Sequence, residues 1–357
     1  MTSDFERALR ARGAVFESMR GLQLPAHFGD SGREWRAARE GGAVFAAGFR
    51  TLIAATGDDR VTFLQGMLSN DVKRVVPGQG VYAAFLTQQG RLVSDLRVYA
   101  ESDRLLLDVP TWRRAALEEG LGRFIVADDI ELTAADEQPL VGIEGPLARA
   151  IVGEALGTTD LPQTAYAHQR LAFESAPLLV VAVSEVEGDG LLLCGPEHIG
   201  PALFEACIEA GAQPLGMRAL DVLRVEAGVA WPGVDTDDST LIMEAGRQAA
   251  ISFTKGCYLG QEVVERVSAR GHVNRQIAGL IIDGDDVPRS GAQVTVDGHE
   301  VGYVTSVVRS ESLRHTIALA MVQVKHAAPG ERVAVDANGT ATAATVAALP
   351  FAPGEPD

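Results

Sequence analysis

Residues 251–275, ISFTKGCYLGQEVVERVSARGHVNR, form the stretch around which we interpret the rest of the chain. Two glycines, Gly256 and Gly260, bracket Cys257, and glycines at this spacing allow a sharp turn or a close approach of the backbone to a ligand. The valines after Gly260 alternate with charged residues, which predicts a short segment with one buried face. A helix and a strand both fit this pattern, because valine is also favoured in strands.

Cys257 precedes a helix N-terminus if the segment after Gly260 is helical, and Lys255 stands two residues before it. The partial positive charge of a helix start and the ammonium group of Lys255 both favour a thiolate over a thiol. The alternative is a buried cysteine that packs as a small apolar side chain. The flanking glycines indicate an exposed loop, and both interpretations remain open.

The same stretch is basic, although the whole chain has a net charge of −17. Its four basic residues outnumber its two acidic ones, and they are Lys255, Arg266, Arg270 and Arg275 against Glu262 and Glu265. A basic segment in an acidic protein suits an anionic small ligand, because the overall charge would otherwise repel it. An ordinary solvated face is the alternative.

The composition of the 357 residues, 46% hydrophobic and 22% charged, predicts a soluble globular protein of two or three domains with a substantial core. The net charge argues against a protein whose main task is to hold nucleic acid through its phosphates. The first twenty residues contain no apolar signal segment, and no run of about 18 apolar residues follows them. We expect a cytoplasmic protein that binds neither nucleic acid nor membrane.

The three cysteines, Cys194, Cys207 and Cys257, are widely spaced and form no C-x-x-C pair. This pattern excludes a disulfide framework and predicts no self-contained zinc or iron–sulfur site. We expect Cys194 and Cys207 in the core. A thiolate at Cys257 has the chemistry to donate one transient ligand to a shared, labile cluster.

A β-hairpin is predicted from AAFLT at residues 83–87, the turn QQG at 88–90 and the returning run LVSDLRVYA at 92–100. Asp95 lies in the second strand, where an acid among apolar residues either points to solvent or serves a pocket. The run GQGVYA at 78–83 has the letters of a dinucleotide fingerprint, but it precedes a strand instead of opening a helix. We therefore reject a dinucleotide site.

A helix is predicted over residues 216–228, because its apolar residues recur on one face. Glu226 lies in the last turn of this helix, where an acid opposes the helix macrodipole and needs a compensating partner. The apolar spacing at residues 5–20 also permits a short helix.

Short alternating strands begin near residue 277, with strong hairpin signals in the dipeptides DG at 297–298 and NG at 338–339. They predict a separate all-β unit, a small barrel, after a region whose mixed hairpins and helices indicate an α+β fold. The predicted division is a core at 1–275, a barrel at 276–350 and a mobile tail at 351–357.

The run KGCYLGQE at residues 255–262 resembles the signature of YgfZ-type folate-binding proteins, which are related to the aminomethyltransferase, or T-protein, of the glycine cleavage system. Four further runs resemble successive blocks of this family: FLQGMLSNDV at 63–72, QGRLVSDLRVY at 89–99, LRVEAGVAWPGVDTDD at 223–238 and VGYVTSVVRSESL at 301–313. The eight-residue signature is the specific part, whereas the other blocks are shared with the T-protein and with folate domains of sarcosine-type demethylases.

The resemblance implies an α+β fold of two interleaved ferredoxin-like units and a C-terminal barrel around a channel for tetrahydrofolate. Glu226 matches the pterin-binding glutamate of the family, and a carboxylate accepts paired hydrogen bonds from the N–H edge of a pterin. Asp95 lies where the T-protein has two consecutive acids, and Ser94 replaces one of them. Arg247 stands where the family is usually apolar. The other residues expected to bind folate are Tyr258, Gln261, Arg266, Arg270 and Arg275.

The implied role is to assist the assembly or repair of iron–sulfur clusters, with indirect support of tRNA-modifying enzymes. The implied partners are folate and iron–sulfur assembly or client proteins. Cys257 would be the functional thiol, Lys255 would bias its charge, and Asp95 would act beside the folate. One alternative is an enzyme, an aminomethyltransferase or a folate-dependent demethylase acting on a small amine. Another is a module that only binds folate, in which Cys257 is packing.

Overall fold

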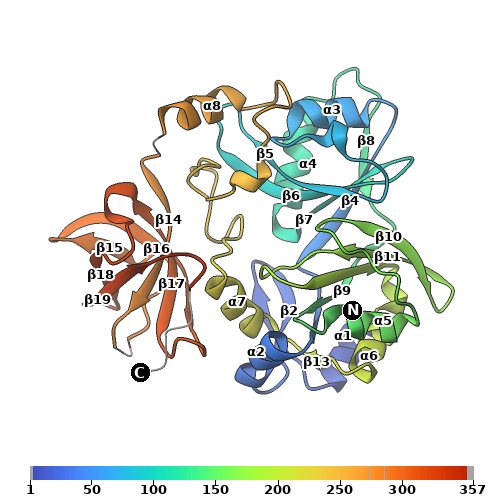
Figure 1. The fold of residues 1–357 in the computed structure, drawn as a ribbon, viewed down its shortest axis with the longest axis horizontal. Coiled ribbons are helices and arrows are strands. Elements are labelled where there is room, and N and C mark those ends of the chain that lie inside the picture. Colours follow the sequence, from blue (N-terminus) through green and yellow to red (C-terminus); the bar gives the residue numbers. More distant parts are fainter. Residues whose placement is uncertain (1–2, 272, 285, 352–357) are drawn as a thin grey trace.

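The protein is described here by a computed structural model that covers residues 3–271, 273–284 and 286–351. It consists of two β-sheets with their helices and a closed β-barrel beside them (Figure 1). The five-stranded sheet has the order β5 (Gly80–Leu86), β6 (Leu92–Ala100), β7 (Leu105–Pro110), β4 (Arg50–Thr56) and β8 (Glu131–Ala134). The six-stranded sheet has the order β10 (His168–Phe173), β11 (Ala176–Ala182), β12 (Gly190–Gly195), β9 (Gln138–Glu144), β3 (Ala43–Ala46) and β13 (Gln213–Pro214).

The two sheets are interleaved along the chain, which confirms the predicted fold class. The chain forms β3 in the six-stranded sheet, leaves to build the whole five-stranded sheet, and returns at β9, which pairs antiparallel with β3. The two sheets face each other, with side chains of both in one buried cluster. Consecutive strand residues point to opposite faces, so Leu52 and Ala54 of β4 lie between the sheets whereas Ile53 and Ala55 face the outer helices.

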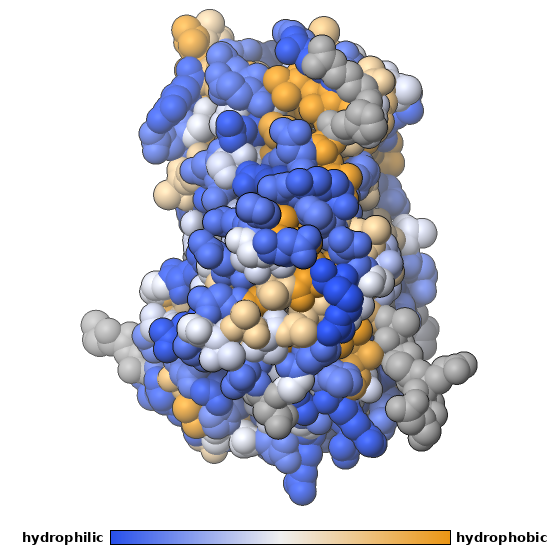
Figure 2. Space-filling model, turned by 90° about the vertical axis from the view of Figure 1, so that its left-hand side faces the viewer, coloured by the Kyte–Doolittle hydropathy of each residue, from blue (hydrophilic) through white to orange (hydrophobic). Residues whose placement is uncertain are grey.

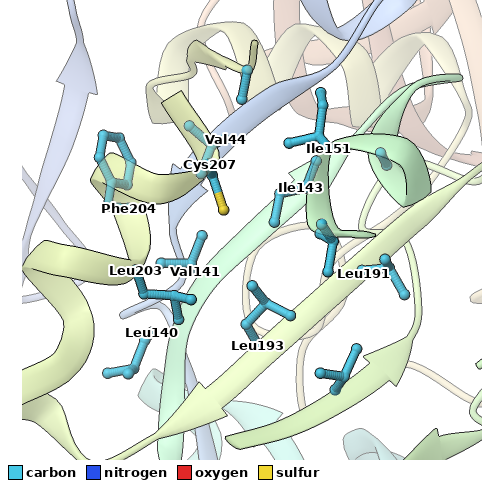
Figure 3. Packing of buried hydrophobic residues seen from close by; sticks show 14 of the residues in the cluster. Val44, Leu140, Val141, Ile143, Ile151, Leu191, Leu193, Leu203, Phe204 and Cys207 are labelled. Atoms are coloured by element: carbon cyan, nitrogen blue, oxygen red, sulfur yellow. The ribbon is translucent and has the colours of Figure 1, made fainter. Parts of the chain in front are cut away.

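Helices cover the outer faces of both sheets. On the five-stranded sheet these are α3 (Arg60–Met67) and α4 (Arg114–Gly122), and on the six-stranded sheet α1 (Asp4–Ala11), α5 (Ala148–Leu156) and α6 (Gly200–Glu209). Cys207 of α6 is fully buried, and its sulfur points toward Val44 and Ile143 (Figure 3). Cys194 is also fully buried, between the sheets. Both cysteines are core residues, as predicted.

The N-terminal segment differs from the predicted helix over residues 5–20. Helix α1 ends at Ala11, and Gly13 has a φ of 90°, a left-handed conformation that helices do not continue through. The chain then forms a hairpin of β1 (Val15–Met19) and β2 (Leu22–His27). Pairing between strands thus overrides a weak helical spacing. Helix α2 (Ser31–Glu40) follows the hairpin.

The C-terminal region forms the predicted barrel. It closes in the order β14 (Arg275–Ile282), β17 (Thr316–Gln323), β16 (His299–Arg309), β15 (Gln293–Val296), β18 (Arg332–Ala337) and β19 (Thr340–Ala347). The side of the molecule on which the barrel lies is mostly hydrophilic, with small apolar areas between the polar side chains (Figure 2). Phe351, in the segment predicted as a mobile tail, is buried, and the rest of that segment lies outside the described residues.

A buried ion pair of the core, between Arg224 and Asp235, is hydrogen-bonded to the barrel. Arg224 of α7 (Met217–Glu226) donates to Asp235 at 2.5 Å and to the hydroxyl of Ser306 on β16 at 2.6 Å. The Arg224 side chain is only 1% exposed, so losing its partner would leave a buried charge unpaired. Helix α8 (Gln261–Arg270) leads from the core to the first barrel strand. In the part of the chain that the structure describes, no helix is long and apolar enough to cross a membrane.

Glu144, at the end of β9, fixes the connection between β11 and β12. Its carboxylate accepts hydrogen bonds from the Ser184 hydroxyl and the Glu185 backbone N–H, both at 2.7 Å. The side chain is buried, and this burial raises the pKa of Glu144 to about 8. At neutral pH Glu144 is therefore mostly protonated in the folded protein.

The raised pKa of Glu144 predicts how stability changes with pH. In the unfolded chain this carboxyl has its ordinary pKa near 4.5, so between about pH 4.5 and 8 the unfolded state binds fewer protons at this site. Its contribution to the free energy of unfolding must fall as pH rises through that window. We expect Glu144→Gln to show a flatter decline between pH 5 and 8 in denaturant titrations. An unchanged slope, equal to that of the exposed control Glu154→Gln, would contradict this assignment.

Candidate functional site

A cavity of about 200 Å³ lies where the inner face of the five-stranded sheet meets the β11–β12 connection and the loop that follows α7. It is smaller than the roughly 300–1,000 Å³ of pockets that enclose a whole drug-sized ligand, so it suits one ring system of a larger molecule. The lining residues are Arg50, Tyr82, Asp95, Arg97, Tyr166, Ser184, Glu185, Glu187, Val229, Trp231, Pro232, Gly246, Arg247 and Ala249.

Asp95 is the central carboxylate of this cavity. Strand alternation places Asp95, Arg97 and Tyr99 of β6 on the face toward the other sheet, whereas Leu96 and Val98 pack under the outer helices. The Asp95 side chain is 8% exposed. Its position in a pocket and not in solvent decides between the two interpretations of this acid.

The two oxygens of Asp95 differ in their hydrogen bonds. Asp95 Oδ2 accepts the Tyr82 hydroxyl at 2.5 Å and lies 3.5 Å from Arg247 Nε. Among the described residues, none donates a hydrogen bond to Asp95 Oδ1. A short, charge-assisted bond of this kind fixes the orientation of the carboxylate.

Two tyrosine rings form an aromatic wall beside Asp95. Tyr82 and Tyr166 stack with ring centroids 6.3 Å apart and an interplanar angle of 21°. Burial raises the pKa of both phenols, well above the ordinary value for Tyr82, so at neutral pH the Tyr82 hydroxyl is a donor. Tyr166 has a φ of 64°, a conformation rare for a bulky side chain, and its N–H donates to the carbonyl of Ala182 at 2.8 Å.

The base of the cavity is a buried ionic network from both sheets. Arg50 donates to Asp108 at 2.8 Å, and Arg97 donates to Asp108 at 3.1 Å and to Glu185 at 2.6 Å. Tyr99 adds a hydrogen bond to Asp108 at 2.8 Å. Burial alone would raise the pKa of Asp108, but the two guanidinium groups outweigh it and lower that pKa. Two positive and two negative side chains thus neutralise one another.

Cys257 and Lys255 lie outside the set of residues that line this cavity. Cys257 is exposed. The Lys255 ammonium donates to the carbonyls of Gln65 and Leu68 at the end of α3, and its Nζ lies 5.0 Å from the ring centroid of Tyr258. Partial burial lowers the pKa of Lys255 to about 8. The segment after Gly260 is helical, so Cys257 does precede a helix N-terminus.

The other residues expected from the 251–275 stretch to bind folate are likewise absent from the cavity lining. Tyr258 is buried under Lys255, and Gln261 donates to Glu265 at 2.5 Å. Arg266 pairs with Glu262, and Arg275 lies 3.3 Å from Glu244. The side chain of Arg270 lies outside the described part of the structure. Arg266 is thus paired with an acid of the same stretch, and Arg275 with an acid outside it.

Glu226 finds its compensating partners inside the protein. Its carboxylate accepts hydrogen bonds from Trp35 at 2.9 Å and Arg39 at 3.0 Å, both on α2, and from Ser310 at 2.5 Å and Ser312 at 2.9 Å after β16. The side chain is 1% exposed. Glu226 therefore joins α2, α7 and the barrel, and it is not among the cavity residues.

Several cavity residues carried no recognisable signal in the sequence. Tyr82 directly precedes the predicted hairpin, and a register shift between Phe85 and Leu86 places it opposite Arg97, which the turn alone does not predict. Tyr166, Glu185 and Asp108 reach the site only through the packing of the two sheets. Among the described residues, no group of three His, Cys, Asp or Glu side chains is placed to hold a metal ion.

Comparisons with known proteins cover nearly the whole chain. The family model "GCVT N-terminal domain" matches residues 5–255, and "Glycine cleavage T-protein C-terminal barrel domain" matches residues 275–352. A protein of Streptomyces avermitilis named "Aminomethyltransferase" is 31% identical over 358 residues, covering 96% of this chain and 95% of that protein. Its namesake from Nostoc sp. is 29% identical over 353 residues, covering 95% and 92%.

The fold matches a solved structure equally well. The glycine cleavage system aminomethyltransferase T from Bartonella henselae superposes with a TM-score of 0.90, covering 99% of this chain and 98% of that one, at 22% identity. The family's aminomethyltransferases use tetrahydrofolate. With both domain models matched in order, the chain belongs to the folate-binding glycine cleavage T-protein family.

Proposed function

We propose that this protein is a tetrahydrofolate-dependent one-carbon transferase of the aminomethyltransferase type, with the cavity as its active site. The observation that carries the proposal is the Asp95 carboxylate, buried beside stacked tyrosine rings with one oxygen fixed by Tyr82 and the other free. Relatives named aminomethyltransferase match along almost their full length, which supports the same class of chemistry. The folate-dependent enzyme, which was the alternative in our interpretation of the sequence, thus becomes the leading proposal.

The cavity residues fit a reduced pterin. The ring system is flat and presents N–H donors along one edge, which a carboxylate accepts and an aromatic wall supports. Tetrahydrofolate supplies the nitrogen atoms that receive the one-carbon unit. A cavity of about 200 Å³ encloses the ring and leaves the remainder of the molecule at the mouth.

Asp95 is the residue that we expect to act on the reacting atoms. Its free Oδ1 is placed to accept or return a proton at the amine nitrogen and to balance positive charge that develops there. Tyr82 holds Oδ2, so the carboxylate keeps one orientation during the reaction. Burial between the sheets excludes water and strengthens these interactions.

The loss of one acid before Asp95 does not remove a group from the cavity. Ser94 replaces that acid, and alternation along β6 turns its side chain away from the face that carries Asp95. Ser94 is fully buried, and its hydroxyl donates to the Asp95 carbonyl at 2.8 Å. A carboxylate at this buried position would need a partner of its own, so the departure is compatible with transferase chemistry.

Asp95→Asn tests the proposed role directly. The amide keeps the size of the side chain and a hydrogen bond with Tyr82, but it neither takes a proton nor balances charge. We expect the rate of aminomethyl transfer to tetrahydrofolate, followed as methylene-tetrahydrofolate, to fall by at least about 100-fold. Tetrahydrofolate should still bind. The control is Asp103→Asn, which alters an exposed acid after β6. Full turnover in Asp95→Asn would refute the assignment.

Glu226→Gln separates the structural role of Glu226 from a role in pterin binding. The amide can keep its oxygen toward Trp35 and Arg39 and turn its NH₂ to the hydroxyls of Ser310 and Ser312, but it removes the negative charge that pairs with Arg39. We expect a loss of about 1–3 kcal/mol in the free energy of unfolding and an unchanged Kd for tetrahydrofolate. The matched control is exposed Glu311→Gln, between the two serines. Weakened folate binding at normal stability would restore the pterin role.

A second candidate function is supported by one specific observation. Cys257 is an exposed free thiol in the KGCYLGQE run that resembles the YgfZ-type signature, and it lies outside the cavity lining. An exposed cysteine before a helix N-terminus is suited to transient ligation of a metal or to redox chemistry. We therefore keep assistance in iron–sulfur cluster assembly or repair as an additional role, exerted on client proteins.

Cys257→Ala distinguishes the two functions. Because the thiol is not part of the cavity, we expect the variant to keep its rate of aminomethyl transfer within about twofold. The second role predicts that cells carrying the variant lose activity of their iron–sulfur enzymes. Cys207→Ala provides a buried thiol control. Full recovery of cluster-enzyme activity by Cys257→Ala would eliminate the second role, and lost transfer would contradict the site assignment.

A further inference from the structure

We propose that Arg247 forms a carboxylate-binding subsite in the cavity, and that Asp95 and Arg247 together bind a small zwitterionic amine, an amino acid or N-methyl amino acid. The role of the bound amine rests on the proposed transferase function. The existence of the subsite is argued from the geometry of Arg247 alone.

Arg247 is the one arginine of the cavity lining that takes no part in the buried ionic network. Arg50 and Arg97 also line the cavity, but both are bound to Asp108, and Arg97 is bound in addition to Glu185. Their positive charge is already matched by two acids. A new anion in the cavity would therefore bind at Arg247.

The hydrogen-bonding capacity of Arg247 is only partly used. Its Nη2 donates to the carbonyl of Ala230, and its Nε lies 3.5 Å from Asp95 Oδ2, longer than an optimal charge-assisted hydrogen bond. Among the described residues, no hydrogen bond is donated by Nη1. The side chain is 18% exposed, so the remaining donors are accessible from the cavity.

The guanidinium group is also held in place before a ligand arrives. It lies 5.8 Å from the ring centroid of Tyr82, over the same ring whose hydroxyl binds Asp95. A planar guanidinium fixed at one end offers two parallel donors to a carboxylate. A subsite of this kind binds without first ordering a flexible side chain, which lowers the cost of binding.

The neighbouring charges favour a zwitterion over a simple anion. A bare carboxylate at Arg247 would be repelled by Asp95, only 3.5 Å from the Arg247 Nε. A molecule with an ammonium group next to its carboxylate reverses this repulsion, because the ammonium group faces Asp95 Oδ1 while the carboxylate faces Arg247. In this placement both charges of the zwitterion are matched, the ammonium group by Asp95 and the carboxylate by Arg247.

Calorimetry with the full chain and four probes tests the subsite. Glycine and sarcosine carry both charges, methylamine carries only the positive one, and acetate only the negative one. We expect glycine or sarcosine to bind at least tenfold more tightly than methylamine and acetate. Arg247→Leu should lose this preference, whereas Arg247→Lys should retain part of it. Arg332→Leu, an exposed barrel position, should bind as the wild type does.

A second set of measurements tests which carboxylate binds to Arg247. The glutamate of folate carries the same group as the small amine. If Arg247 binds the carboxylate of the amine, we expect Arg247→Leu to change the affinity for tetrahydrofolate and for tetrahydrobiopterin, which lacks that glutamate, by the same factor. Weaker binding of tetrahydrofolate alone, without any glycine binding, would overturn the zwitterion and assign the subsite to folate. Equal binding of all four probes, or an Arg247→Leu variant that is folded and keeps the preference, would overturn the subsite. Glycine binding without tetrahydrofolate binding would instead refute only the proposed function.

Discussion

The ion pair between Arg97 and Glu185 is the interaction on which the site depends. Arg97 stands on β6 of the five-stranded sheet and Glu185 on the β11–β12 connection of the other sheet, so their 2.6 Å contact fastens the two sheets together beneath the cavity. Both side chains are almost fully buried. Removing one partner of such a pair typically costs about 3–5 kcal/mol, because the other charge is left unpaired. Arg50 and Asp108 extend the pair into a network of balanced charge.

This balance determines what remains for chemistry. With Arg50, Arg97, Asp108 and Glu185 neutralising one another, the charges that a ligand meets are those of Asp95 and Arg247, together with the exposed Glu187. Glu144 stabilises the position of Glu185, because it accepts hydrogen bonds from the Ser184 hydroxyl and the Glu185 N–H in the β11–β12 connection. The Asp95 carboxylate and the Arg247 guanidinium group thus lie side by side above a neutral network. We assign proton transfer to the first and carboxylate binding to the second.

Local signals made much of the fold predictable, whereas the composition of the site depended on distant contacts. The QQG turn predicted the β5–β6 hairpin, the DG and NG dipeptides predicted barrel strands, and Gly260 was followed by a helix. Asp95 was identified within its strand. The need of Glu226 for a compensating partner was predictable from its place at the end of a helix, but the identity of the partners was not, because they lie on α2 and after β16, 84–191 residues away along the chain. Arg97 and Glu185 are separated by 88 residues, and neither carries a local motif.

The measurement that tests this account most directly is a crystal structure of the full chain with bound tetrahydrofolate. The account predicts the pterin ring in the cavity, against Tyr82 and beside the Asp95 carboxylate. A pterin ring bound beside Cys257 or Glu226, with the cavity around Asp95 holding only water, would contradict it.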